Sequence, residues 1–380
     1  MAALNPFQYG DLALDEAFTD RARELEALEA DIRNGHNVAI IAPRRLGKSS
    51  LVRRATQELL AEGVLVVEVD LMSTPSKEKL AAKLAGSIHD DLATVLYKAK
   101  ERLRMFATLR VVPVITINPD DGSPSFSFSA SQGEEDIDAT LERLLELPAQ
   151  IAAERQRRVV IFFDEFQEIT DIDPRLPAQM RAIFQQQPHV SHIYSGSRRD
   201  MMRRLFNHEN EPFYRSAKIV ELGGIPIDEF AAFVRAQFER TDRNIAADVV
   251  DGLLAVTGGH PYATQELAYA LWEQVPEGFT ATHADLERAL VDVLHSENAH
   301  FTLLWDNASR AQRLLMQALA AEPGRPFTAS YRQRHQLPGV SGVQRALETL
   351  LADESVTKKV DGNYDIMEPF LREWIRSYAS

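Results

Sequence analysis

Residues 37–51, NVAIIAPRRLGKSSL, contain residue types that can hold a phosphate group. A short apolar run ends in a loop, and Gly47, Lys48 and Ser49 then open a helical stretch, which is the order that a P-loop requires. Backbone N–H groups at a helix start surround phosphate oxygens, and the helix dipole favours their charge. Lys48 would neutralise the β- and γ-phosphates, and Ser49 would offer its hydroxyl to Mg²⁺. A chance strand–helix junction is the structural alternative.

Ala42 stands where a P-loop usually has its first glycine. A left-handed backbone there would cost alanine about 1–2 kcal/mol. Pro43 biases the preceding residue toward an extended conformation, so we expect the strand to run on into the loop. The residues expected to bind nucleotide here are Ala42, Pro43, Arg44, Arg45, Leu46, Gly47, Lys48, Ser49 and Ser50.

An apolar run that ends in two carboxylates, VVIFFDEF at 159–166, is the second signal. A strand of this kind delivers Asp164 to the sheet edge that carries the P-loop. Asp164 would hold Mg²⁺ through water, and Glu165 would polarise the attacking water. A buried strand ending in a solvated acidic turn is the alternative. The two motifs together predict ATP and Mg²⁺ as ligands.

A third signal, HIYSGSRRDMM at 192–202, follows the next predicted strand. A polar residue or arginine at this point would sense the γ-phosphate. Ser197 and Arg198 are the candidates, with Arg199 as a neighbour. A solvated arginine pair is the alternative for the two arginines.

Strands and helices alternate through the first part of the chain, which predicts an α/β fold with a parallel sheet covered on both faces. Residues 110–130 interrupt this alternation with two β-rich runs around Asp120-Asp121-Gly122, typical of a hairpin. Its Phe126 and Phe128 alternate with serines, so one apolar face packs on its own domain or meets a partner. The remaining strands are expected at 37–42, 64–71, 158–166, 192–197 and 218–222, and helices at 18–34, 48–63, 77–105 and about 135–154.

Beyond residue 226 we expect helices only, interrupted at TGGHP (257–261), until a final hairpin around Asp361-Gly362-Asn363. The predicted domains are an α/β core at 1–222, a helical domain at 223–303 and a C-terminal domain at 304–380.

Composition sets bounds on the class of protein. The 380 residues are 45% hydrophobic and 26% charged, as in ordinary globular proteins, and no apolar run approaches the roughly 20 residues of a membrane span. The first residues lack the basic start and apolar core of a signal peptide. There is no cysteine, so disulfides and thiolate-bound metals are excluded and a cytoplasmic location is expected.

The net charge of −14 argues against a chain that coats nucleic acid with its whole surface. From Arg310 to Ser380 there are ten Lys/Arg against eight Asp/Glu, a net of +2, which leaves −16 for residues 1–309. Only the C-terminal domain is a candidate for nucleic-acid contact, and its excess of positive charge is small.

APRRLGKSSL, FFDEFQEI, SGSRRDMM and TGGHPY occur in this order and resemble the STAND class of P-loop ATPases. The resemblance is closest to its archaeal-type prokaryotic ATPase clade, a relative of the AAA+ initiator ATPases. In that clade Ala-Pro-Arg often replaces the first P-loop glycine. The resemblance implies a P-loop ATPase core, an α-helical lid and a winged-helix domain.

The resemblance also implies roles for residues outside the P-loop. Asp164 and Glu165 would be the Walker B pair, and Arg198 falls near the sensor arginine. Pro261, in a Gly-x-Pro element, would bring the lid to the nucleotide. Phe7 would cover the adenine, with a core or interface aromatic as the alternative.

NPFQYG (5–10), which contains Phe7, precedes a helix whose Arg21 and Glu24 match the Arg-x-x-Glu box of the family. These two residues are three apart on a helix, so a simple ion pair is the alternative.

The third helix of the predicted winged helix would present Ser341, Gln344, Arg345 and Glu348. One arginine and one glutamate make a poor phosphate-binding face, although Lys358 and Lys359 of the wing add positive charge. We favour a winged helix that contacts protein over one that contacts DNA.

The sequence therefore predicts an ATP-binding and slowly hydrolysing switch with Glu165, Lys48 and Arg198 as catalytic residues. ATP between core and lid would reposition the lid and winged helix to engage a protein partner, and self-association is a further expectation. The alternatives are a DNA-binding AAA+-like ATPase and an adaptor that binds ATP without hydrolysing it.

Overall fold

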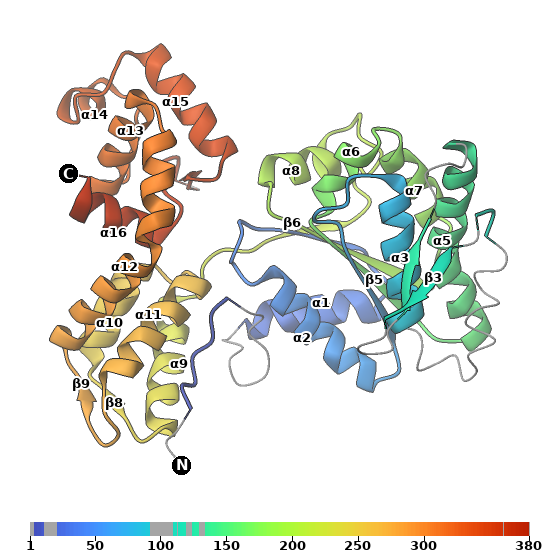
Figure 1. The fold of residues 1–380 in the computed structure, drawn as a ribbon, viewed down its shortest axis with the longest axis horizontal. Helices are drawn as coiled ribbons and strands as arrows, with labels where there is room; N and C mark the ends of the chain where they lie inside the picture. The colour runs from blue at the N-terminus through green and yellow to red at the C-terminus, as the bar shows by residue number, and fades with distance from the viewer. Residues whose placement is uncertain are drawn as a thin grey trace. The chain divides into compact units, whose positions relative to one another are not determined.

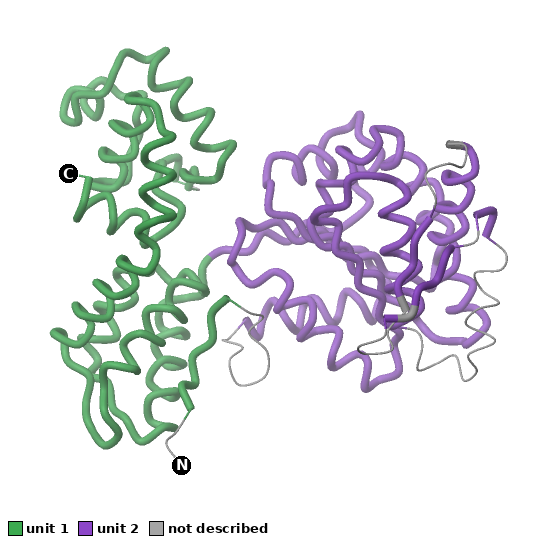
Figure 2. Tube along the Cα trace, in the orientation of Figure 1, with its two compact units in different colours: residues 1–20, 224–380 green, residues 21–223 purple. Residues whose placement is uncertain are grey.

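The computed structural model describes residues 4–10, 21–91, 109–111, 113–118, 124–128, 134–359 and 361–379. The chain divides into two compact units (Figure 2). We call residues 21–223 the sheet unit, and residues 1–20 with 224–380 the helical unit. None of the described helices is long and apolar enough to cross a membrane.

Five parallel strands in the order β2-β5-β6-β1-β7 form the centre of the sheet unit (Figure 1). In the register, Ile41 lies opposite Gly196 and Phe163 lies opposite Tyr194, so three neighbouring strands end at the same edge. The strands are β1 (Val38–Ile41), β2 (Leu65–Asp70), β5 (Val159–Asp164), β6 (Val190–Gly196) and β7 (Lys218–Glu221).

Helices cover both faces of this sheet, which confirms the predicted fold class (Figure 1). Side chains alternate between the faces of a strand, and Val159, Ile161 and Phe163 of β5 share one hydrophobic core with α3, α5 and α7. Helices α1 and α2 pack against each other on the opposite face. The helices are α1 (Ala22–Arg33), α2 (Lys48–Ala61), α3 (Lys77–Asp91), α5 (Glu134–Arg155), η2 (Phe166–Glu168), α6 (Ile169–Ile172), α7 (Leu176–Phe184) and α8 (Arg199–Asn207).

The predicted hairpin consists of antiparallel β3 (Val114–Ile117) and β4 (Pro124–Ser127). Phe126 and Phe128 are buried in the core of the sheet unit, and the Phe126 ring centroid is 5.4 Å from that of His89. The apolar face of the hairpin therefore packs on its own unit. The predicted Asp120-Asp121-Gly122 turn lies outside the described residues, as does the part of the predicted 77–105 helix beyond Asp91.

The helical unit contains the expected helices and more structure than expected. A short parallel pair, β8 (Asn244–Ile245) and β9 (Thr280–Ala281), shows that the expectation of helices alone was wrong. A final helix, α16 (Pro369–Tyr378), was not expected either. The other elements are α9 (Ile227–Arg240), α10 (Ala247–Thr257), α11 (Pro261–Gln274), α12 (His283–Asn307), α13 (Arg310–Ala321), α14 (Ala329–Arg334), α15 (Val340–Ala352), β10 (Val356–Lys358) and β11 (Tyr364–Ile366).

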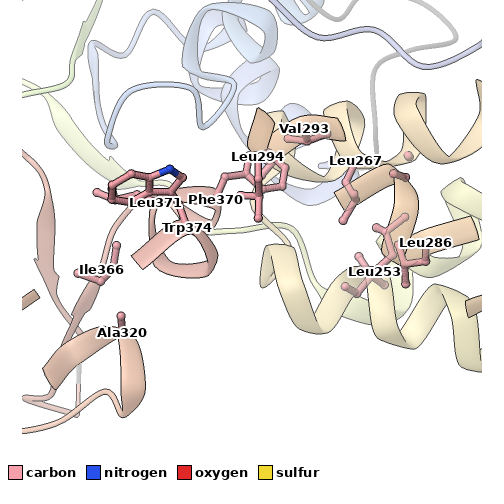
Figure 3. Close-up of a cluster of buried hydrophobic side chains, with 14 of the residues drawn as sticks. Leu253, Leu267, Leu286, Val293, Leu294, Ala320, Ile366, Phe370, Leu371 and Trp374 are labelled. Atoms are coloured by element: carbon pink, nitrogen blue, oxygen red, sulfur yellow. The ribbon is translucent and has the colours of Figure 1, made fainter. Parts of the chain in front are cut away.

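One hydrophobic core runs through the whole helical unit (Figure 3). Leu253 and Leu267 of the lid helices and Phe370 of α16 belong to this same cluster. Helix α12 passes without a break through the domain boundary predicted at 303/304, and Trp374 Nε1 donates to Asn298 Oδ1 of that helix at 2.8 Å. The lid and the winged helix therefore form one compact body.

Residues 4–10 belong to this body and not to the α/β domain predicted at 1–222. Phe7 is 1% exposed, and its ring centroid is 5.6 Å from that of Phe238. Asn5 Nδ2 donates to the carbonyl of Tyr269 at 3.2 Å, and the N–H of Gln8 donates to Gln265 Oε1 at 3.3 Å. An aromatic side chain and two polar contacts thus fix this segment to α9 and α11.

Candidate active site

The loop between β1 and α2 resolves the question raised by Ala42. The N–H of Ala42 donates to the carbonyl of Gly196 at 3.3 Å, so the strand pairing continues for one more residue, as expected from Pro43. The left-handed residues of the loop are Arg45 (φ 62°) and Gly47 (φ 79°) instead. A glycine is needed at position 47, and the backbone strain falls on Arg45.

Lys48 is 5% exposed, and its ammonium donates to the carbonyls of Ala42 at 3.0 Å and Pro43 at 3.1 Å. Ser49 Oγ donates to Asp164 Oδ2 at 2.6 Å. The structure thus brings the end of β5 to the start of α2, which is the juxtaposition on which the prediction of a nucleotide site depends.

The donor set at this point suits Mg²⁺. The hydroxyl of Ser49 and the carboxylate of Asp164 are hard oxygen ligands in direct contact. Mg²⁺ is usually bound by one or two protein oxygens together with substrate phosphates and waters. Ser49 and Asp164 would therefore hold the ion, and its charge would offset that of the phosphates.

Glu165 is held in place by three hydrogen bonds and is 8% exposed. Its Oε2 accepts from Gln167 Nε2 at 2.5 Å, and from Oγ and N of Ser197 at 2.7 and 3.2 Å. Burial alone would raise the pKa of this carboxyl, but the hydrogen bonds from Gln167 and Ser197 and the charge of Lys48 outweigh it and lower the pKa below its usual value. These contacts fix the orientation of the Glu165 carboxylate and favour its ionised form, and its role as general base stays a prediction.

Two polar contacts at this edge were not predicted. Ser195 Oγ donates to Asp164 Oδ1, and Gln167 donates to Glu165. Ser195 is a fully buried hydroxyl near the end of β6, a position where a polar group needs a partner. Gln167 had no such signal, because the turn after Glu165 (φ 52°) decides where its side chain points.

The residues after β6 divide into two groups. Ser197 faces Glu165, whereas Arg198 forms salt bridges with Glu168 at 3.3 Å and Asp171 at 3.4 Å and is 43% exposed. The alternative of a solvated arginine thus describes the observed contacts of Arg198, and its sensor role stays a prediction. Of the remaining P-loop residues, Arg44 and Arg45 are exposed, and Pro43, Leu46 and Ser50 are buried.

Pro261 and Phe7 lie in the helical unit. Pro261 is the first residue of α11, and Gly258 and Gly259 before it have left-handed backbones. Its contact with nucleotide stays a prediction. Phe7 is buried among Phe233, Phe238 and their neighbours, so its ring belongs to the core, and we do not assign it to adenine.

Comparison with protein families identifies the chain. A family model described as an ATPase domain predominantly from Archaea matches residues 18–267. The chain belongs to this ATPase family. A second model, of a probable winged helix domain, matches residues 299–377 of the ATPase. Family membership and the P-loop geometry support ATP binding and hydrolysis. No curated protein sequence matched the chain.

Solved structures share the fold of this ATPase at low sequence identity. A Walker-type ATPase of Pyrococcus abyssi is 16% identical with a TM-score of 0.64, over 96% of this chain and 97% of that one. The ORC1 protein of Aeropyrum pernix, solved in complex with DNA, is 12% identical with a TM-score of 0.51, over 96% of this chain and 94% of that one. These likenesses extend over both units.

Proposed function

We propose that this ATPase is a slow, regulated molecular switch of the STAND class. The observation that carries the proposal is the state of Glu165. The pKa of its carboxyl is lowered, which favours the ionised form that a general base needs, and Ser197 and Gln167 both donate to one of its two oxygens, Oε2. Exchange of one of these hydrogen bonds for water would free Oε2 to accept a proton, and this exchange is the regulated step of the proposal.

Each residue of the site then has a defined task. Lys48 would exchange the carbonyls of Ala42 and Pro43 for phosphate oxygens. Ser49 and Asp164 would hold Mg²⁺, which offsets the charge of the phosphates. Glu165 would orient the attacking water and accept its proton, and Ser197 would set when the carboxylate is free.

The shared core refines how a switch would respond. The sequence predicted that nucleotide repositions the lid and the winged helix, and these two parts share one buried hydrophobic core. Arg372 of α16 also donates to the carbonyl of Val256 at 2.7 Å, in the last turn of α10 before the Gly-Gly-His-Pro turn. We therefore propose that the whole helical unit responds to nucleotide as one body and that this exposes the surface for a protein partner.

Substitution of Glu165 tests the hydrolytic part of the proposal. Glu165→Gln should lower ATP turnover by about 10²–10⁴-fold, because the general base is lost. Steady-state phosphate release measures turnover, and titration with a fluorescent ATP analogue should show that affinity is retained. Glu154→Gln, which changes an exposed acid of α5 in the same way, is the matched control. Equal turnover by Glu165→Gln and the unmutated chain would refute the hydrolytic assignment of Glu165, and turnover at the background rate in both would favour the non-hydrolysing adaptor.

Substitution of Ser197 tests the regulated part. Ser197→Ala removes one of the hydrogen bonds that occupy Glu165, worth about 1.5–3 kcal/mol to a charged acceptor. We expect a several-fold rise in turnover at saturating ATP. A fall in turnover would show that Ser197 orients the base and does not restrain it.

A pull-down with ATP-loaded Glu165→Gln would then identify the partner.

Action on duplex DNA is the second candidate, favoured by the winged helix match and by the fold shared with ORC1. Against this function, cations of the winged helix are already paired with acids of the same domain: Lys359 pairs with Asp365 at 2.6 Å, and Arg334 pairs with Glu322 at 2.5 Å. Anisotropy with a labelled duplex between 50 and 200 mM salt separates the two functions. A steep salt dependence with about six or more released ions would favour DNA.

A further inference from the structure

Arg21 is a buried arginine at the N-cap of α1, and its guanidinium contacts two distant parts of the chain. It is 4% exposed. One nitrogen, Nη2, donates to the carbonyl of Leu46 at 3.1 Å and to the carbonyl of Gly223 at 2.8 Å. The other, Nη1, donates to Glu24 Oε1 at 3.3 Å, so the ion pair foreseen for these residues forms but is only one of three contacts.

Both carbonyls occupy special positions. Leu46 lies in the P-loop between its two left-handed residues, Arg45 and Gly47. Gly223 follows Leu222, whose N–H pairs with the carbonyl of Ile41 at 3.1 Å, and it is the last residue of the sheet unit. Arg21 thus joins the phosphate loop to the point where the chain leaves for the helical unit.

A residue that only stabilised the fold at this position would not need to be a buried arginine. Burying a guanidinium is costly unless its donors are satisfied, and apolar residues of similar volume often pack at least as well. Burial also lowers the pKa of Arg21, which the half-exposed Glu24 offsets in part. What an arginine adds is a planar group with several donors in fixed directions. Because both carbonyls share one nitrogen, a displacement of Leu46 changes the geometry of the bond to Gly223.

We infer that Arg21 is a positioning residue that couples the conformation of the P-loop to the backbone at residues 222–225. The inference rests on nucleotide binding at the P-loop, as proposed above, but not on the identity of a partner. Ile225 in turn donates its N–H to the carbonyl of Gly259 at 2.9 Å, next to Pro261. The conformation of the P-loop therefore reaches the lid turn through Arg21 and two residues of chain.

Hydrogen exchange of the full chain, with and without a non-hydrolysable ATP analogue and Mg²⁺, tests the inference. In the unmutated protein, nucleotide should change the exchange of the amides in the 222–226 segment, in which Pro226 has none, by about tenfold, the effect of one hydrogen bond. Arg21→Met removes every donor and should abolish this response, while analogue affinity changes by less than about threefold, since Lys48 and Ser49 remain. Glu24→Gln keeps both carbonyl contacts and should respond as the unmutated chain does.

A second variant, with a polar side chain, shows whether the effect of Arg21→Met comes from the lost contacts or from a folding defect. Arg21→Gln is two bonds shorter and reaches neither carbonyl, so it should behave as Arg21→Met does. A normal nucleotide response at 222–226 in either variant, or no response in an unmutated chain that binds the analogue, overturns the inference. Failure of the unmutated chain to bind the analogue refutes the proposed function instead. In that case, hydrogen exchange of the nucleotide-free proteins tests the coupling. Loss of Arg21 must raise amide exchange at 44–48 and at 222–226 together, and a rise at only one of these segments overturns the coupling.

Discussion

The carboxyl edge of the sheet and the core of the helical unit are both buried, but they are built from opposite chemistry. At the sheet edge, Lys48, Glu165, Ser195 and Ser197 are nearly inaccessible. Lys48 donates to loop carbonyls, Ser195 donates to Asp164, and Ser197 donates to Glu165. In the helical unit the buried residues are predominantly apolar and span the lid and the winged helix. Burying polar groups costs free energy, so their concentration at one edge supports the proposed ligand site there, whereas the apolar core holds the helical unit together.

Substitution of Phe7 tests the apolar core of the helical unit and should give the largest effect of the variants compared here. Phe7→Ala should destabilise the helical unit by about 3–5 kcal/mol, because a fully buried ring leaves a cavity. All three tryptophans of the chain, Trp272, Trp305 and Trp374, lie in the helical unit, so their fluorescence during urea denaturation measures its stability. Gln8→Ala, at an exposed position in the same segment, is the control. Unchanged stability together with weaker ATP affinity in Phe7→Ala would instead support the hypothesis that Phe7 contacts adenine.

Lys48 tests the polar side. Lys48→Ala should weaken ATP binding by about 100-fold, the loss expected for a charge-assisted hydrogen bond of ~2.7 kcal/mol. Titration with a fluorescent ATP analogue measures the affinity. Lys79→Ala, which removes an exposed lysine of α3, should bind as the unmutated chain does. Equal affinities for both variants would contradict the site at the carboxyl edge.

His192 tests whether every buried polar group belongs to the site. It lies inside β6, its ring stacks on Phe184 with centroids 4.0 Å apart, and burial together with the charge of Arg181 lowers its pKa from 6.5 to about 3. Between these two values the unfolded chain binds a proton that the folded chain does not, so stability falls as the pH is lowered below 6.5. We expect a loss of about 2 kcal/mol in the sheet unit between pH 6.5 and 4.5.

His192→Phe keeps the stacking and removes the titration, so this acid-induced loss should be smaller in the variant. Circular dichroism during urea denaturation follows both units, and tryptophan fluorescence follows the helical unit alone. An identical pH dependence in the variant would assign the acid sensitivity to other groups.

Local patterns predicted most of the fold and the centre of the site. The apolar runs that became β1, β5 and β6 were long enough to identify, and each ends in the residues that meet at the sheet edge. Two-residue strands such as β8 leave no such pattern, and α16 was overlooked although Pro369 stands at its start. The sequence could not show that residues 4–10 join the helical unit, or that Arg198 turns toward Glu168 and Asp171, because tertiary packing decides both.

The bond between Arg21 and Gly223 means that the sheet unit begins and ends at one point. In architectural terms it is an insertion within a helical domain, whose own sequence is divided into a short N-terminal piece and a long C-terminal piece. An isolated helical unit therefore needs both pieces. The sheet unit is in turn suited to circular permutation, since a short linker between residues 223 and 21 would close it without disturbing the sheet.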